Sequence, residues 1–192
     1  EDANEKIHGR GQANAEFHGM GTTTSALALL PEGAVVAHVG DSRVYRARRN
    51  RIEQLSFDHS LVWEMSAGQP GRRNDVPLYI PKNIITRSLG PNPQVQVDVE
   101  GPFPVEAGDY FLLCSDGLSG QVTDDEMATI LACLSPDEAV HLLVGESPVR
   151  ERRVVLVDAL GERGRRVVGT GPLHDVNGAR LRVPAAVDPE LG

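Results

Sequence analysis

The stretch GDYFLLCSDGLSG, residues 108–120, has the strongest strand pattern of the chain and ends in a turn that carries an aspartate. An apolar run such as residues 110–113, bounded by turn formers, predicts a buried strand. Two interpretations of Asp116, which follows this run, remain open. It is a surface turn residue, because Ser, Asp and Gly are the usual turn formers, or it is a metal ligand held at the end of a rigid strand.

Length and composition restrict the class of protein. The 192 residues suffice for one domain with a sizeable core and would be cramped as two. Hydrophobic residues at 40% and charged residues at 24% are typical of a soluble globular protein. The net charge of -8 argues against nonspecific nucleic-acid binding. No apolar run approaches a membrane span, and the first residues lack a signal pattern. We therefore expect no nucleic-acid or membrane partner and a cytoplasmic protein, whose Cys114 and Cys133 are reduced core residues.

Charge and composition change near Gly145. Residues 1–145 contain 11 Lys and Arg against 20 Asp and Glu, a net charge of -9, whereas residues 146–192 contain 8 Arg and 7 acids, a net charge of +1. The second segment has no Lys and no aromatic residue. We predict a domain over residues 1–145 and a divergent tail over 146–192 that buries little and has low order after about residue 168. Its sequence RRVVLVDAL is the one candidate strand.

The remaining pattern predicts an α+β protein with antiparallel sheets. Strands are expected within residues 20–30, 34–40 and 43–56, and their short connections predict an antiparallel meander. Further strand-like pieces follow at 83–90 and 95–101. Runs of strands followed by runs of helices indicate the α+β class.

Helix signals are local and specific. Thr123 with Glu126, and Ser135 with Glu138, form two capping boxes, and the second helix is expected to end at Gly145. Residues 58–68 predict a helix with Asp58 as its N-cap and Gly68 as its terminator. At most a frayed helix is expected around residues 3–8, and 69–82 are expected to be an irregular loop.

Four blocks together resemble a known family. GMGTTTSALALL, AHVGDSRVYRARRNRIEQLSFDHSLV, ITRSLG and VEAGDYFLLCSDGLSGQVTDDEM occur in this order within residues 19–144. Their order and spacing are similar to those of the PPM (type 2C) family of metal-dependent protein serine/threonine phosphatases, bacterial branch. The resemblance implies two antiparallel sheets between outer helix layers (α-β-β-α). It also implies two Mg2+ or Mn2+ ions held by aspartates, and a water that bridges them and attacks phosphorus. Phosphoserine and phosphothreonine proteins would be the substrates, and bacterial serine/threonine kinases possible partners.

The resemblance assigns roles to particular residues. Asp116 matches a metal-binding aspartate of the family's Ser-Asp-Gly block. Asp41 matches an aspartate near a weaker metal position, although a turn residue between two strands is an equal alternative. No catalytic side chain is assigned. Framework positions of the family are matched by Arg43, Asp58, His59, Thr86 and Arg87. His59, next to an expected helix cap, is interpreted as a hydrogen-bonded structural histidine, and the other histidines show no metal-ligand spacing.

Three family blocks are absent from this sequence. The family's arginine with an acidic pair and its Asp-Gly-x-Gly-Gly block have no match, and neither has its Gly-Gly-x-Asp-Asn turn. Asp158, and Asp175 with Asn177, are poor substitutes because neither lies in such a turn. We therefore expect a domain incomplete at both ends and inactive as given, since one ligand cannot hold two metals.

Alternatives to a phosphatase fragment remain open. One is an inactive pseudophosphatase that binds a phosphoprotein or a kinase, and another is a relative that acts on a regulator of sigma factors. An in-frame Arg and Asp-Gly-x-Gly-Gly segment upstream of Glu1 would favour the fragment. For the tail, a shifted reading frame in a GC-rich gene and a genuine extension are both open, and translation of the other two frames would separate them.

Overall fold

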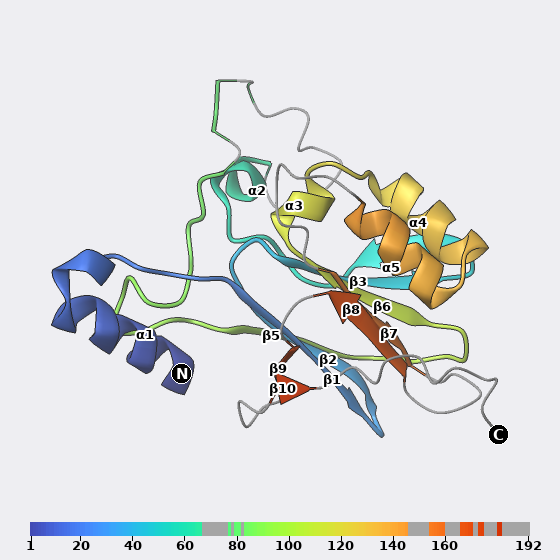
Figure 1. The fold of residues 1–192 in the computed structure, drawn as a ribbon, viewed down its shortest axis with the longest axis horizontal. Helices are drawn as coiled ribbons and strands as arrows, with labels where there is room; N and C mark the ends of the chain where they lie inside the picture. Colours follow the sequence, from blue (N-terminus) through green and yellow to red (C-terminus); the bar gives the residue numbers. More distant parts are fainter. Residues whose placement is uncertain are drawn as a thin grey trace.

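The structure, a computed structural model, describes residues 1–66, 77, 79–81, 83–145 and 154–159, and the backbone of 166–170, 173–174 and 180–181. The helices are α1 (Asp2–Ala13), the 3-10 helix η1 (Ala15–Phe17), α2 (Leu61–Met65), α3 (Asp116–Ser119), α4 (Asp124–Cys133) and α5 (Pro136–Val144) (Figure 1). The strands are β1 (Thr24–Leu30), β2 (Gly33–Val39), β3 (Arg43–Arg48), β4 (Arg51–Gln54), β5 (Asp98–Phe103), β6 (Tyr110–Cys114), β7 (Val154–Asp158), β8 (Arg166–Thr170), β9 (Leu173–His174) and β10 (Arg180–Leu181).

Two antiparallel sheets confirm the predicted α+β class. One has three strands in the order β1-β2-β5, and the other has five in the order β4-β3-β6-β7-β8, while β9 and β10 form a separate pair. The hairpin β3–β4 turns at Arg49 and Asn50, whose positive φ angles of 48° and 61° suit a two-residue hairpin turn. β6, the buried strand predicted from the apolar run at residues 110–113, is the middle strand of the larger sheet.

The predicted meander is wrong at one connection. β1 pairs with β2 and β3 with β4 as expected, but the second neighbour of β2 is β5 and that of β3 is β6. Between β2 and β3 the chain therefore passes from one sheet to the other at residues 40–42. A short turn is compatible with either pairing, so the sequence could not distinguish them.

Two apolar layers hold the molecule together. Between the sheets, Val36 of β2 and Phe111 of β6 are fully buried in one cluster. On the other face of the larger sheet, Leu112 packs with residues of α4 and α5, which cover that face in Figure 1. The outer face of the smaller sheet leaves Val99 64% exposed, and the expected second helix layer is not found over it within the described ranges.

The helices agree with the sequence in part. Both capping boxes are present as predicted, at Thr123 and Ser135. α1 is longer than expected: buried Asn4 donates to the carbonyls of Asn92 and Pro93 and accepts from the Gly90 N–H, which anchors the helix.

Other local expectations need correction. α2 is shorter than predicted, and its N-cap is Ser60, not Asp58. The predicted terminator Gly68 and most of the loop 69–82 lie outside the described residues. The strand-like piece 83–90 forms only isolated bridges, at Ile85 and Leu89. Cys114 is buried as expected, but Cys133 is exposed.

The larger sheet continues past Gly145. RRVVLVDAL does contain a strand, β7, which pairs with β6 along its whole length and then with β8. Val154 and Leu156 are fully buried, contrary to the expectation that this segment buries little. The expectation of low order after about residue 168 falls mostly on residues outside the description. Within the described ranges, none of the helices combines the length and apolar character needed to cross a bilayer.

Candidate metal centre

The strand register brings the two predicted ligands to the same end of the larger sheet. Arg43, the first residue of β3, pairs with Cys114, the last residue of β6. Asp41 lies two residues before Arg43, and Asp116 two residues after Cys114. Because β3 and β6 are antiparallel, both carboxylates lie at the same end of these strands, which is called this edge of the sheet below. Asp41 comes from the crossover between the sheets and Asp116 from the start of α3.

The two carboxylates at this end of the sheet influence each other electrostatically. The pKa of Asp41 is raised above its ordinary value, first by burial and then by the negative charge of Asp116. Carboxylates that repel each other in this way form a site that a cation would stabilise. Within the described residues, however, no group of three or more His, Cys, Asp or Glu side chains is placed to hold a metal ion.

The substitutes considered for the missing turn do not join this edge. Asp158 pairs with Tyr110 at the opposite end of β6 from Asp116. Asp175 and Asn177 lie outside the described residues. Cys114 is near the site, but burial raises the pKa of its thiol to about 12, which leaves it protonated and unsuited to act as a nucleophile.

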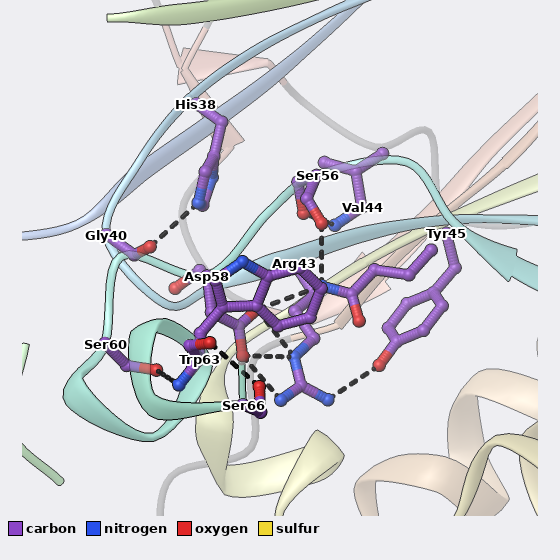
Figure 2. Close-up of polar contacts among 12 residues, drawn as sticks. His38, Gly40, Arg43, Val44, Tyr45, Ser56, Asp58, Ser60, Trp63 and Ser66 are labelled. Atoms are coloured by element: carbon purple, nitrogen blue, oxygen red, sulfur yellow. Dashed lines mark hydrogen bonds and ion pairs between the residues drawn. The ribbon is translucent and has the colours of Figure 1, made fainter. Parts of the chain in front are cut away.

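A buried ion pair between Arg43 and Asp58 holds the chain directly after the crossover at residues 40–42. The guanidinium of Arg43 donates to both carboxylate oxygens of Asp58, at 2.7–3.1 Å, and to the Tyr45 hydroxyl at 3.0 Å (Figure 2). The side chains of Arg43 and Asp58 are 13% and 5% exposed. Asp58 was predicted to cap α2; its carboxylate instead neutralises Arg43 at the start of β3, while the Ser60 hydroxyl accepts from the Trp63 N–H. Both residues match framework positions in the resemblance.

Two histidines hold the glycine that precedes Asp41. The Gly40 N–H donates to Nδ1 of His59 at 3.0 Å, and the Gly40 carbonyl accepts from Nε2 of His38 at 2.8 Å (Figure 2 shows the second contact). The two rings lie with their centroids 5.1 Å apart. His59 is therefore a buried, hydrogen-bonded residue, as its sequence context indicated.

Asp98 is the residue of this network that the sequence did not single out. At the start of β5, it lies 2.9 Å from Nε2 of His59 and 2.5 Å from a guanidinium nitrogen of Arg87. Burial opposes its ionisation, but these hydrogen bonds outweigh burial and lower the pKa of Asp98. The available signal was weak, because VQVDVEG alternates apolar and polar residues and Asp98 occupies one of the regular polar positions.

The buried His38 predicts acid sensitivity in a defined pH range. Burial lowers the pKa of His38 below 6.5; the nearby His59 lowers it further, whereas the hydrogen bond to Gly40 and the charges of Asp58 and Asp98 partly oppose the shift. The unfolded chain therefore takes up this proton first, and the free energy of unfolding should fall as the pH decreases below about 6.5, until the lower folded pKa is reached. Urea unfolding at about pH 7 and pH 5 measures the change.

Replacement of His38 by glutamine separates the titration of His38 from the titration of other groups. His38→Gln retains a donor toward Gly40 and cannot titrate, so its stability should change less between the two pH values. Asp98, whose pKa is lowered in the folded protein, also contributes to the free energy of unfolding. This contribution changes only below about pH 4, because it is lost as the pH falls through the pKa that Asp98 has in the folded protein. His141→Gln, on the exposed side of α5, is the control. An unaltered pH dependence in His38→Gln would contradict the assignment.

Comparison with known proteins agrees with the family resemblance that the sequence blocks indicated. The family model for protein phosphatase 2C matches residues 2–62. Protein phosphatase PhpP of Streptococcus pneumoniae is 41% identical over 128 residues, which are 67% of this chain and 51% of the relative. The solved serine/threonine phosphatase of S. agalactiae is 34% identical with a TM-score of 0.64, over 74% of this chain and 59% of that one.

A further solved structure is the catalytic domain of the serine/threonine protein phosphatase PstP in complex with two manganese ions. It is 25% identical with a TM-score of 0.62, over 86% of this chain and 66% of that one. This chain spans about half the length of the curated relatives it matches. The agreement of sequence blocks, sheet architecture and relatives shows that the chain belongs to the protein phosphatase 2C (PPM) family.

Proposed function

We propose that the chain is part of a metal-dependent protein serine/threonine phosphatase of the cytoplasm, in which Asp41 and Asp116 bind Mg2+ or Mn2+. The observation that carries the proposal is the convergence of these two carboxylates at one end of the larger sheet. Phosphoserine and phosphothreonine proteins are the proposed substrates, and bacterial serine/threonine kinases the proposed partners. The names of the relatives and the manganese-bound neighbour support this assignment.

The donor atoms suit these ions in kind but not in number. Mg2+ and Mn2+ prefer carboxylate and water oxygens; Asp41 offers a carboxylate from the crossover that precedes β3, and Asp116 offers one from the start of α3, just after β6. A pair of such ions would neutralise charge on the phosphoryl oxygens of a substrate. Each ion needs several converging oxygens, however, and two carboxylates do not complete a two-metal centre. The described residues therefore bind and orient part of the centre only.

This shortage favours a second candidate function. Because no three-ligand group lies among the described residues, an inactive pseudophosphatase that binds a phosphoprotein or a kinase also fits the structure. The two candidates differ in whether this segment can support hydrolysis when the other ligands are present. That question can be tested directly with a chimera.

In the test, the matched segment of S. pneumoniae PhpP is replaced by that of this chain, so that the relative supplies the other ligands. We expect the chimera to hydrolyse a phosphothreonine peptide with Mn2+, and Asp116→Ala to reduce this activity to background. The unmodified 192-residue chain should bind Mn2+ only weakly in a calorimetric titration and hydrolyse the peptide at background, because its described ligands are incomplete.

Control variants make each outcome informative. Asp125→Ala removes an exposed acid of the first turn of α4 and should leave the activity of the chimera unchanged. A chimera that melts cooperatively but is inactive would overturn the phosphatase proposal and favour the binding module. Activity that survives Asp116→Ala would show that Asp116 is not a ligand. A tight two-metal isotherm for the chain alone would contradict the incompleteness of its site. If the chimera does not fold, NMR line broadening of the Asp41 and Asp116 amides by Mn2+ in the chain itself tests the ligands.

A further inference from the structure

We propose that His59, oriented by Asp98, is a positioning residue that fixes Asp41 for metal binding by holding the backbone of Gly40. This inference rests on the proposed metal-dependent function and concerns how one of its ligands is held. It assigns to His59 neither metal coordination nor proton transfer. The proposal follows from the conformation of Gly40, the atoms that contact it and the orientation of the histidine ring.

Gly40 has a backbone conformation that needs outside restraint. Its φ is +117°, and a Cβ atom at this position would lie 2.4 Å from Cγ2 of Thr23. No other residue fits, so the crossover before Asp41 depends on glycine. Glycine is also the residue with the widest choice of backbone conformations. The direction in which Asp41 leaves the crossover is therefore fixed by contacts and not by the residue's own preference.

His59 provides two of these contacts. Its Nδ1 accepts from the Gly40 N–H at 3.0 Å, and its backbone N–H donates to the Gly40 carbonyl at 2.7 Å. The carbonyl belongs to the peptide unit that contains the Asp41 nitrogen. One residue thus restrains the peptide units on both sides of Gly40, and through the second it restrains the backbone of Asp41.

The orientation of the ring follows from its other nitrogen. Because Nδ1 accepts from the Gly40 N–H, the ring proton is assigned to Nε2, which donates to the Asp98 carboxylate at 2.9 Å. Asp98 is itself held by Arg87. This series of contacts, from the Asp98 carboxylate through the His59 imidazole to the Gly40 backbone, selects a single tautomer and a single ring orientation of His59. Carboxylates do the same for histidines that coordinate metals.

Asp41 needs such support because of its neighbour. Its carboxylate is half-buried and lies at the same end of the larger sheet as the negatively charged carboxylate of Asp116. In the absence of a cation this repulsion favours conformations in which the two carboxylates separate. A fixed crossover keeps them converged, so that less ordering is required when an ion binds.

Two substitutions of His59 separate positioning from general stability. The Asn side-chain oxygen can take the place of Nδ1, so His59→Asn retains the acceptor for Gly40. The Gln side chain reaches the place of Nε2, so His59→Gln retains the contact with Asp98 and loses the acceptor. We expect His59→Gln to speed the amide hydrogen exchange of Gly40. We also expect a given amount of added Mn2+ to broaden the Asp41 resonances of this variant about 10–100-fold less than those of the wild type. His59→Asn should stay within a fewfold of the wild type in both measurements.

The measurements are made on the metal-free chain and then during Mn2+ addition, with His141→Gln as the control for loss of a histidine. If Gly40 exchange in His59→Gln equals that of the wild type, the restraint is absent and the inference is overturned. Faster Gly40 exchange with unchanged broadening at Asp41 would show a purely structural role. If Mn2+ broadens neither Asp41 nor Asp116 in the wild type, the metal-site proposal itself fails, and so does this inference; that result is recognisable because it does not depend on His59.

Discussion

Asp58→Ala is expected to lower the free energy of unfolding by about 3–5 kcal/mol, because it leaves the buried guanidinium of Arg43 without its counter-ion. Three hydrogen bonds from Arg43 end on the Asp58 carboxylate, and Gln54 donates a further one at 2.9 Å. Among the hydrogen bonds of the described residues, the guanidinium makes one more, to the Tyr45 hydroxyl, which is neutral. Urea unfolding monitored by the fluorescence of the buried Trp63 measures the loss.

A second ion pair on the same strand serves as the matched control. Arg46 contacts Glu53, whose side chain is 58% exposed, so Glu53→Ala should cost less than about 1 kcal/mol. Replacing both members of the buried pair, as Arg43→Met with Asp58→Leu, should recover much of the loss, because no charge is then left buried. Equal effects of Asp58→Ala and Glu53→Ala would show that burial does not set the strength of the Arg43 pair.

The same pair shows what local sequence signals can and cannot predict. Asp58 precedes an apolar segment, as N-caps do, and Ser60 fits that role as well. The structure assigns the cap to Ser60 because the Asp58 carboxylate is engaged by Arg43, 15 residues earlier. The capping boxes at Thr123 and Ser135 were predictable because both partners lie within one turn. Contacts that cross the sheet have no comparable local pattern.

The assignment of strands to sheets from the sequence was limited for the same reason, because contacts between strands have no local pattern. Alternation and apolar runs identify strands, but they do not state which strand is the neighbour. The crossover at Gly40 separates two hairpins into different sheets, and this glycine is required by its close approach to Thr23 rather than by a turn type. β7 was a candidate strand from its valines, yet its place next to β6 follows only from the three-dimensional register.

The candidate site was predictable to the extent that the family motifs carry it. Asp116 and Asp41 were identified from the resemblance, and the register of β3 and β6 places them at one edge. Asp98 was missed because its partners, His59 and Arg87, come from segments that the sequence did not connect with β5. A polar residue in a predicted strand next to a buried histidine is the kind of signal that could have indicated it.

Leu112→Ala is expected to lower the free energy of unfolding by about 2–5 kcal/mol. Leu112 is fully buried in the middle strand of the larger sheet, and its side chain packs in the cluster that α4 and α5 form over that sheet. β3 and β7 pair with β6 along its whole length, so the backbone has little freedom to move into the cavity that alanine would leave. The cost should therefore include most of the cavity term as well as the lost transfer free energy.

Two further leucines on the same elements separate packing from residue type. Leu142, on α5, is 54% exposed, and Leu142→Ala should change stability by less than about 0.5 kcal/mol. Leu113 points to the opposite face of β6, where it is only partly buried against the layer between the sheets, so its replacement should have an intermediate effect. The order Leu112, Leu113, Leu142 in measured loss follows from burial alone. If Leu113→Ala were the most costly of the three, the main core would lie between the sheets rather than beneath α4 and α5.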